Sequence, residues 1–138
     1  MSSFDVQSIE IAAPFSTAFH YLADPANLPK WTHAFTHVAD GHATMETPAG
    51  TVQVGLRVEA SEPHGTVDWT ITFPDGGVAR AASRVIPHGD RSIYTFVLEA
   101  PPAPLEQLEG ALTEQSRILT TELATLARRL GENGRGHA

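Results

Sequence analysis

The sequence predicts a single α+β domain in which an antiparallel β-meander is followed by a long C-terminal helix. The chain has 138 residues, of which 41% are hydrophobic, and this suits one compact domain with a real core. From Phe35 to Glu99, apolar and polar residues alternate between closely spaced turn signals, as antiparallel strands require. After a proline-rich stretch, leucines recur at helical spacing from Leu105 to Leu130.

The N-terminal segment is expected to form one strand and two short helices. The alternation from Phe4 to Ile11 contains a phase slip, which predicts a strand that carries a bulge or lies at an edge. A first helix starts at Pro14, because a proline at the first helical position loses no intrahelical hydrogen bond. Asp24 is expected to cap a second helix, which Pro29 limits to about two turns, so that Trp31 lies just beyond it.

The meander is divided by turn signals rich in Pro, Gly and Asp. Its inward phase is expected to consist of Val52, Val54, Leu56, Val58, Val67, Trp69, Ile71, Phe73, Tyr94, Phe96 and Leu98. The stretch from Val78 to Ile86 allows two phases. We expect its small residues to face inward and leave space above the sheet, because the opposite phase would bury two guanidinium groups. Arg80 and Arg84 would then reach outward towards Asp68 or Glu59.

One interruption in the leucine stripe of the C-terminal helix bears on function. The stripe jumps from Leu112 to Leu119, and Gln115 and Ser116 fill the missing step. Polar groups on a packed helix face are costly unless they are hydrogen-bonded or hydrated. Two interpretations follow: the centre of the helix faces a cavity, or Ser116 bonds to its own backbone while Gln115 is solvated.

The end of the helix is predicted at Gly131, because glycine is the residue that most often follows the last helical turn. The domain would then cover residues 1–131. The polar, glycine-rich segment 132–138 is expected to be a flexible tail.

Composition excludes several classes of function. The chain has no cysteine, which excludes a disulfide scaffold, a thiolate nucleophile and a Cys-ligated metal site. The formal net charge is -7, with 9 Lys+Arg against 16 Asp+Glu, whereas a nucleic-acid partner requires clustered cations. The N-terminus has no signal-peptide pattern, and no stretch approaches the roughly 18 apolar residues of a membrane span. We therefore expect a cytoplasmic protein that neither binds nucleic acid nor inserts into a membrane.

Two stretches near the N-terminus resemble the opening of a known superfamily. They are the run from Ile9 to Pro14 (IEIAAP) and the run from Tyr21 to Trp31 (YLADPANLPKW), with Phe19 between them. This opening, followed by a multi-strand region and a long helix, resembles the polyketide cyclase/dehydrase and lipid-transport proteins of the SRPBCC superfamily, which share the START-like fold. The resemblance covers roughly residues 4–130.

The resemblance implies a helix-grip fold, in which a curved seven-stranded antiparallel sheet surrounds a long C-terminal helix. It also implies a hydrophobic cavity between the sheet and this helix, with two short helices near its mouth. Members of the superfamily bind lipids, sterols, polyketides, hormones or aromatic intermediates, and some catalyse cyclisation or dehydration. The resemblance also allows a homodimer, although no interface can be identified from the sequence.

A metal site is one catalytic interpretation. His33 and His37 are four residues apart, which on a helix would place both imidazoles on one face, with Glu46 or Asp68 completing the site. On a transition from loop to strand, the same histidines would be solvated or bonded to backbone. No phosphate-binding loop and no His-Glu-x-x-His motif occurs, so no cofactor is expected.

Acid–base chemistry in the cavity is the other catalytic interpretation. His33, His37, Tyr94 and Ser116 are the available groups, and a histidine near its ordinary pKa suits the proton transfers of aldol-type cyclisation or dehydration. In the competing interpretation, Tyr94 belongs to the core and both histidines lie on the surface.

The sequence favours binding of a small hydrophobic or aromatic molecule, lipid- or polyketide-like, as the function. The long helix must cover the apolar phase of the meander, so their side chains converge. The expected lining is Trp31, Phe35, Trp69, Ile71, Tyr94, Phe96, Leu112, Gln115, Ser116 and Leu119. The two tryptophans are either walls that stack on a flat ligand, or core residues. A cyclase or dehydratase in the same cavity is the alternative, and an interaction module without a cavity is a third class.

Overall fold

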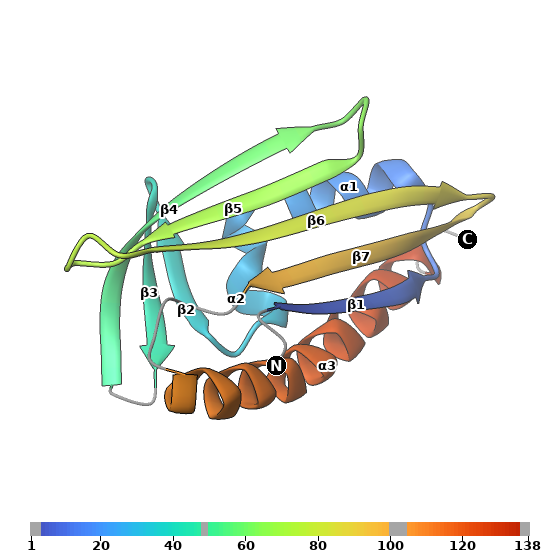
Figure 1. Ribbon diagram of the computed structural model, residues 1–138. Coiled ribbons are helices and arrows are strands. Elements are labelled where there is room, and N and C mark those ends of the chain that lie inside the picture. Colours follow the sequence, from blue (N-terminus) through green and yellow to red (C-terminus); the bar gives the residue numbers. More distant parts are fainter. Residues whose placement is uncertain (1–3, 48–49, 100–104, 136–138) are drawn as a thin grey trace.

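The computed structural model describes residues 4–47, 50–99 and 105–135, apart from the side chains of residues 47, 105–115 and 132–135. This part of the chain forms one seven-stranded antiparallel sheet with helices (Figure 1), which confirms the predicted α+β helix-grip fold. In chain order the elements are β1 (Phe4–Ile11), α1 (Phe15–Ala23), η1 (Pro25–Asn27), α2 (Leu28–Trp31), β2 (Phe35–Ala39), β3 (His42–Thr47), β4 (Gly50–Ser61), β5 (Thr66–Thr72), β6 (Val78–His88), β7 (Arg91–Glu99) and α3 (Leu105–Arg135).

The order of the strands explains where the core lies. The sheet runs β1-β7-β6-β5-β4-β3-β2, so the first strand pairs with the last and the rest form a meander. The segment α1-η1-α2 connects the two edge strands, β1 and β2. Helix α1 contacts β4, β5, β6 and β7, whereas α3 contacts β1, α1 and α2. The sheet therefore curves around the helices, and the core lies between the two layers (Figure 1).

Strand β1 lies at an edge of the sheet, as one of the two interpretations of its phase slip required. It has no bulge, because its residues pair in unbroken register with β7, from Phe4 opposite Glu99 to Ile11 opposite Ser92. The slip arises because its apolar residues occupy both faces. Phe4 and Val6 are 55% and 51% exposed, whereas Ile11 is fully buried.

Helix α1 begins at Phe15, one residue later than predicted. Pro14 occupies the N-cap position, and Ala18, Phe19 and Leu22 are buried. Their spacing of three and four residues places them on one side of the helix. This side faces the sheet, because α1 contacts its central strands.

The second helical segment differs from the prediction at both ends. The side chain of Asp24 accepts a hydrogen bond from the backbone N–H of Ala26 at 3.0 Å, so it caps the short 3₁₀ turn η1 rather than an α-helix. Pro29 lies in the first turn of α2, where a proline is tolerated, and it does not end the helix. Trp31 is therefore the last residue of α2, and its side chain is buried.

Strand β6 has the predicted phase. Ser83 is buried and both arginines of this strand are exposed. The arginine contacts differ from the expectation, because the Nε of Arg84 donates to the backbone carbonyl of His64 at 3.3 Å rather than to Asp68 or Glu59. The inward phase of β6 thus consists of small side chains in its central part.

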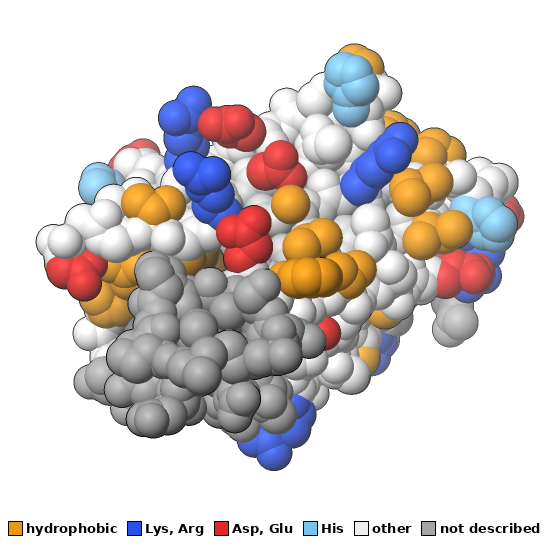
Figure 2. Space-filling model, viewed as in Figure 1, with side chains coloured by type: hydrophobic (Ala, Val, Ile, Leu, Met, Phe, Trp, Pro, Cys, Tyr) orange, Lys and Arg blue, Asp and Glu red, His pale blue; other side chains and the backbone are white. Residues whose placement is uncertain are grey.

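The outer face of the sheet is mixed in character. Figure 2 shows cationic and anionic side chains interspersed with apolar ones on the side opposite α1. Arg57 pairs with Glu59 at 3.0 Å, and Arg91 pairs with Glu10. Because these pairs are exposed to solvent, each contributes little to stability.

Helix α3 carries the predicted leucine stripe over the part whose side chains are described. Leu119, Leu123, Leu126 and Leu130 are buried. The helix continues past Gly131 to Arg135, so Gly131 is not a C-cap. The domain boundary and the flexible tail predicted for 132–138 stay predictions, because much of this segment lies outside the described residues.

Candidate ligand-binding interior

An aromatic cluster covers part of the inner face of the sheet. The ring centroids of Trp69 on β5 and Phe96 on β7 are 5.7 Å apart, and those of Phe96 and Tyr94 are 6.2 Å apart. Strand β6 lies between β5 and β7, and it places Ala81 opposite Trp69 and Ser83 opposite Phe96. Because these residues of the middle strand are small, rings from both neighbouring strands reach over it and meet. The cluster, defined as Trp69, Tyr94 and Phe96, is called the aromatic cluster below.

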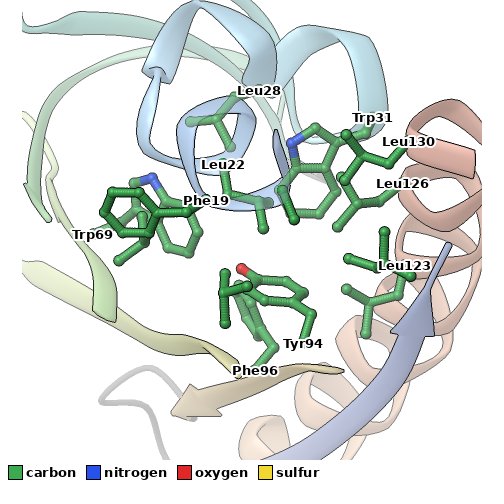
Figure 3. Close-up of a cluster of buried hydrophobic side chains, with 14 of the residues drawn as sticks. Phe19, Leu22, Leu28, Trp31, Trp69, Tyr94, Phe96, Leu123, Leu126 and Leu130 are labelled. Carbon is green, nitrogen blue, oxygen red and sulfur yellow. The ribbon is translucent and has the colours of Figure 1, made fainter. Parts of the chain in front are cut away.

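Helical side chains close the interior opposite the aromatic cluster. Figure 3 shows side chains of α1 and α2 on one side and leucines of α3 on another, directed into the space between the helices and the sheet. The large apolar side chains of the three α-helices that are at most 4% exposed are Phe19, Leu22, Leu28, Trp31, Leu119, Leu123, Leu126 and Leu130. The interior is therefore enclosed by apolar side chains from the sheet and from each helix.

Two polar atoms of the aromatic cluster have no hydrogen-bond partner among the described residues. They are the hydroxyl oxygen of Tyr94 and the indole nitrogen of Trp69. Tyr94 is fully buried and Trp69 is 4% exposed. Nearly all buried polar atoms in proteins have a partner, and an unpaired one costs about 1–3 kcal/mol. The aromatic cluster therefore contains two buried polar atoms that are not satisfied by the described residues.

Tyr94 is held in its neutral form. Burial raises the pKa of the phenol well above its usual range, the nearby Ser83 hydroxyl opposes this in part, and the charge of Asp68 raises the pKa further. The Ser83 hydroxyl itself donates to the backbone carbonyl of Val67, and no hydrogen bond of ordinary geometry joins it to Tyr94. Tyr94 therefore provides an O–H donor rather than a phenolate base.

A buried carboxylate lies on one flank of α3. Glu122 is 8% exposed, and its Oε2 accepts a hydrogen bond from the backbone N–H of His33 at 2.6 Å. Burial raises the pKa of Glu122, and this outweighs the backbone N–H groups of His33 and Ala34 and the charge of His33, which lower it. The carboxylate connects α3 to the segment between α2 and β2.

The family of the chain follows from a match that covers nearly all of it. A family model described as polyketide cyclase / dehydrase and lipid transport matches residues 6–131. The chain belongs to this family. The predicted membership of the SRPBCC superfamily is thereby confirmed.

Solved structures share the fold of this polyketide cyclase/dehydrase family domain. The protein XoxI from Bacillus cereus has a TM-score of 0.71 at 14% identity, covering 94% of this chain and 96% of that one. A START superfamily protein from Mycobacterium smegmatis has a TM-score of 0.61 at 13% identity, covering 99% and 100%. The Zhui aromatase/cyclase from Streptomyces sp. R1128 has a TM-score of 0.65 at 11% identity, covering 92% of each chain. At these identities the likeness establishes the fold alone, and no curated protein matches the sequence.

The structure gathers most of the lining residues predicted for this family domain into one region. The buried cluster contains Trp31, Trp69, Ile71, Tyr94, Phe96 and Leu119, with Phe35 packed against it. The side chains of Leu112 and Gln115 lie outside the described residues. That these residues contact a ligand stays a prediction.

Ser116 turns towards the edge strand β1. Its hydroxyl donates to Oδ2 of Asp5 at 2.8 Å and lies 3.3 Å from the donating Nε2 of Gln7. The hydroxyl of Thr120, one turn further along α3, donates to Oε1 of Gln7 at 3.0 Å. We call Asp5, Gln7, Ser116 and Thr120 the β1–α3 clasp. Neither interpretation of Ser116 anticipated this contact, and the cavity beneath Gln115 and Ser116 stays a prediction.

The two candidate histidines do not share a helix. His33 lies between α2 and β2, His37 lies within β2, and both side chains are exposed. Among the described residues, no group of three or more His, Asp or Glu side chains is placed to hold a metal ion. The helical premise of the metal site is therefore wrong, and the position at a transition from loop to strand is confirmed.

Sequence reasoning missed Glu122 as a residue of this region. The available signal was its position between Leu119 and Leu123, beside the buried stripe of α3, where a charged residue needs a partner. Its partner is a backbone group 89 residues away in the chain, which no local pattern reveals.

Within the described part of the chain, no helix is long and apolar enough to cross a membrane.

Proposed function

We propose that this domain binds a small hydrophobic or aromatic molecule, lipid- or polyketide-like, between the sheet and α3. The observation that carries the proposal is the pair of buried, unpaired polar atoms of Trp69 and Tyr94 inside an aromatic and aliphatic interior. Ligand sites combine such apolar walls with a few polar groups that orient the ligand. The family description, which includes polyketide cyclisation and lipid transport, supports the same function.

The position of α3 supports this proposal as well. The β1–α3 clasp holds one flank of the helix, and Glu122 holds the opposite flank through the backbone N–H of His33. Both anchors lie beside the leucine stripe. They therefore hold the helix by its two flanks, and neither of them joins its inner face to the aromatic cluster. The proposed lining is the predicted set, except that the Ser116 hydroxyl is already engaged by Asp5.

Native mass spectrometry of the protein purified from its own host tests the proposal directly. We expect a measured mass above that of the chain, because a small apolar compound is bound. Organic extraction should remove this compound and return the mass to that of the chain. The extracted compound should rebind to the stripped protein with one-to-one stoichiometry. Protein that retains no compound and binds none of a panel of naphthalene-type probes would contradict the proposal.

A pair of tryptophan substitutions on α3 locates the site. Leu119→Trp places an indole in the buried stripe, whereas Ile118→Trp places the same group at a position that is 36% exposed. We expect Leu119→Trp to weaken probe binding at least tenfold while Ile118→Trp leaves it unchanged. If the interior is solidly packed, Leu119→Trp will instead lower stability by about 1–3 kcal/mol through overpacking. Unchanged affinity in both variants would exclude this lining.

A cyclase or dehydratase is a second candidate, favoured by the same two donors. The buried O–H and N–H would polarise the carbonyl oxygen of a ligand by donating hydrogen bonds to it. Every histidine whose side chain is described is exposed, so proton transfer by His33 or His37 inside this interior is not supported. Turnover that depends on a histidine-like pKa would argue against catalysis by the Tyr94 and Trp69 donors alone.

The predicted cytoplasmic location, homodimer and lack of a nucleic-acid partner stay predictions.

A further inference from the structure

We infer that Trp69 and Tyr94 are specificity-determining donors, which select an aromatic ligand bearing an uncharged acceptor oxygen such as a ketone or quinone and disfavour a carboxylate. This inference rests on the proposed function, because it names the chemical class of the ligand in the same interior. It follows from the donor chemistry of the two residues, their common position and the charges around them.

Trp69 and Tyr94 each offer a hydrogen-bond donor to a ligand. An indole N–H can only donate a hydrogen bond, and a neutral phenol directs its single O–H at an acceptor. Both atoms are buried and unpaired in Trp69 and Tyr94. The Ser83 hydroxyl on β6 donates to the carbonyl of Val67, and no hydrogen bond joins it to the Tyr94 hydroxyl. A ligand that satisfies the interior therefore has to bring acceptor atoms.

The two donor residues lie close to each other. The rings of Trp69 and Tyr94 both contact Phe96, with centroid separations of 5.7 and 6.2 Å. The two donors thus belong to one aromatic cluster rather than to separate regions (Figure 3). A flat aromatic ligand with one or two oxygens on its rim matches this cluster, because it can stack on a ring while its oxygens meet the donors.

The described cationic side chains lie on the surface of the protein. Every Lys, Arg and His whose side chain is described is exposed, and residues 100–115 contain none of these types. Among the described residues, the buried ionisable acid is Glu122, on the flank of α3. A carboxylate beside the aromatic cluster would therefore meet no cation among the described residues, and the negative charge of Asp68, which acts on the Tyr94 phenol, would oppose it. An ionised group without a partner is strongly disfavoured in such surroundings.

Three probes of nearly equal shape test the inference. 2-Acetylnaphthalene carries a ketone, 2-isopropenylnaphthalene replaces its oxygen by a CH₂ group, and 2-naphthoate carries a carboxylate. We expect the ketone to bind at least tenfold more tightly than the hydrocarbon, because only the ketone pairs a donor that is otherwise left unpaired. We expect the carboxylate to bind at least tenfold more weakly than the ketone at neutral pH.

Matched variants assign the preference to the two donors. Tyr94→Phe and Trp69→Phe should each reduce the ratio of ketone to hydrocarbon affinity, whereas the affinity for the hydrocarbon should change little in Tyr94→Phe. Tyr21→Phe is the control, because it removes another unpaired hydroxyl from a residue of α1 that is only partly buried. Thermal unfolding of each variant verifies that it folds. If Trp69→Phe does not fold, Tyr94→Phe alone still tests the inference.

The outcomes separate the two proposals. Equal affinities for ketone and hydrocarbon would overturn the inference and leave the proposed function standing. A ketone preference that survives in both Tyr94→Phe and Trp69→Phe would overturn the roles of these donors. Binding of 2-naphthoate as tight as that of the ketone would overturn the argument from charge. Failure of every probe to bind would contradict the proposed function itself.

Discussion

The β1–α3 clasp and the aromatic cluster both place polar groups beside apolar side chains, but they differ in how these groups are paired. In the clasp, Ser116 donates to Asp5 and Thr120 donates to Gln7, so each hydroxyl has a partner on the neighbouring element. In the cluster, the polar atoms of Trp69 and Tyr94 have none among the described residues. The clasp is also partly exposed, whereas the cluster is buried.

This difference separates polar groups that stabilise the fold from polar groups that are available to a ligand. A paired, partly hydrated hydrogen bond contributes roughly 0.5–1.5 kcal/mol to folding, and removing it costs about that amount. A buried unpaired group lowers stability until something binds to it. Substitutions in the two regions should therefore have opposite effects on stability and on ligand affinity.

The largest expected effect is that of Trp69→Ala. Removing a buried indole from the centre of the sheet should lower the free energy of unfolding by about 3–5 kcal/mol, because it leaves a cavity where Phe96 now finds its partner. Urea denaturation measures this loss. Trp69→Phe retains most of the ring and should lose much less stability. A Trp69→Ala protein with unchanged stability and lost ligand affinity would make Trp69 a ligand wall rather than a core residue.

The next effect is that of Glu122→Ala, which removes the acceptor for the backbone N–H of His33. The cost should be about 1–3 kcal/mol, because a partly buried donor is left unpaired. Glu122→Gln retains an acceptor oxygen and should lose less, so the pair separates hydrogen bonding from charge. Equal losses in both variants would show that the charge, and not the acceptor, holds the segment between α2 and β2.

The same residue predicts a dependence of stability on pH. The pKa of Glu122 is raised in the fold, chiefly by burial, so the folded protein releases this proton less readily than the unfolded chain does. The wild type should therefore lose stability relative to Glu122→Gln as pH rises from the ordinary pKa of glutamate through the raised value, and the difference should be constant outside that window. Urea denaturation of both proteins across a pH series measures it, and a relative gain for the wild type would contradict the assignment.

Much of the fold could be predicted from the sequence because its strands and helices depend on local periodicity. Alternation of apolar and polar residues correctly predicted the inward phase of β5 and the inward small residues of β6. Helical spacing correctly predicted the described part of the leucine stripe of α3. The errors concern residues with two permitted roles. Pro29 is tolerated inside the first turn of α2, and Gly131 lies within α3 rather than after it.

The candidate site could be predicted only in part, because the pairing of polar atoms is set by contacts distant in the sequence. Ser116 and Asp5 are 111 residues apart, and Glu122 and His33 are 89 residues apart. The spacing of apolar residues placed both Ser116 and Tyr94 on faces that point towards the interior. It contained no information on which of the two would find a partner, although this decides which one is available to a ligand.

The smallest effects provide the most direct comparison of the two regions. Ser116→Ala should lower stability by about 1 kcal/mol, because Asp5 loses one hydrogen-bond donor. Tyr94→Phe should leave the stability of the ligand-free protein unchanged or slightly higher, because it removes a buried hydroxyl that has no partner. Chemical denaturation of both variants, with and without 2-acetylnaphthalene, checks the pair. The ligand should stabilise Ser116→Ala as much as the wild type but Tyr94→Phe less, and a clear loss of stability in ligand-free Tyr94→Phe would indicate that the hydroxyl is already satisfied within the fold.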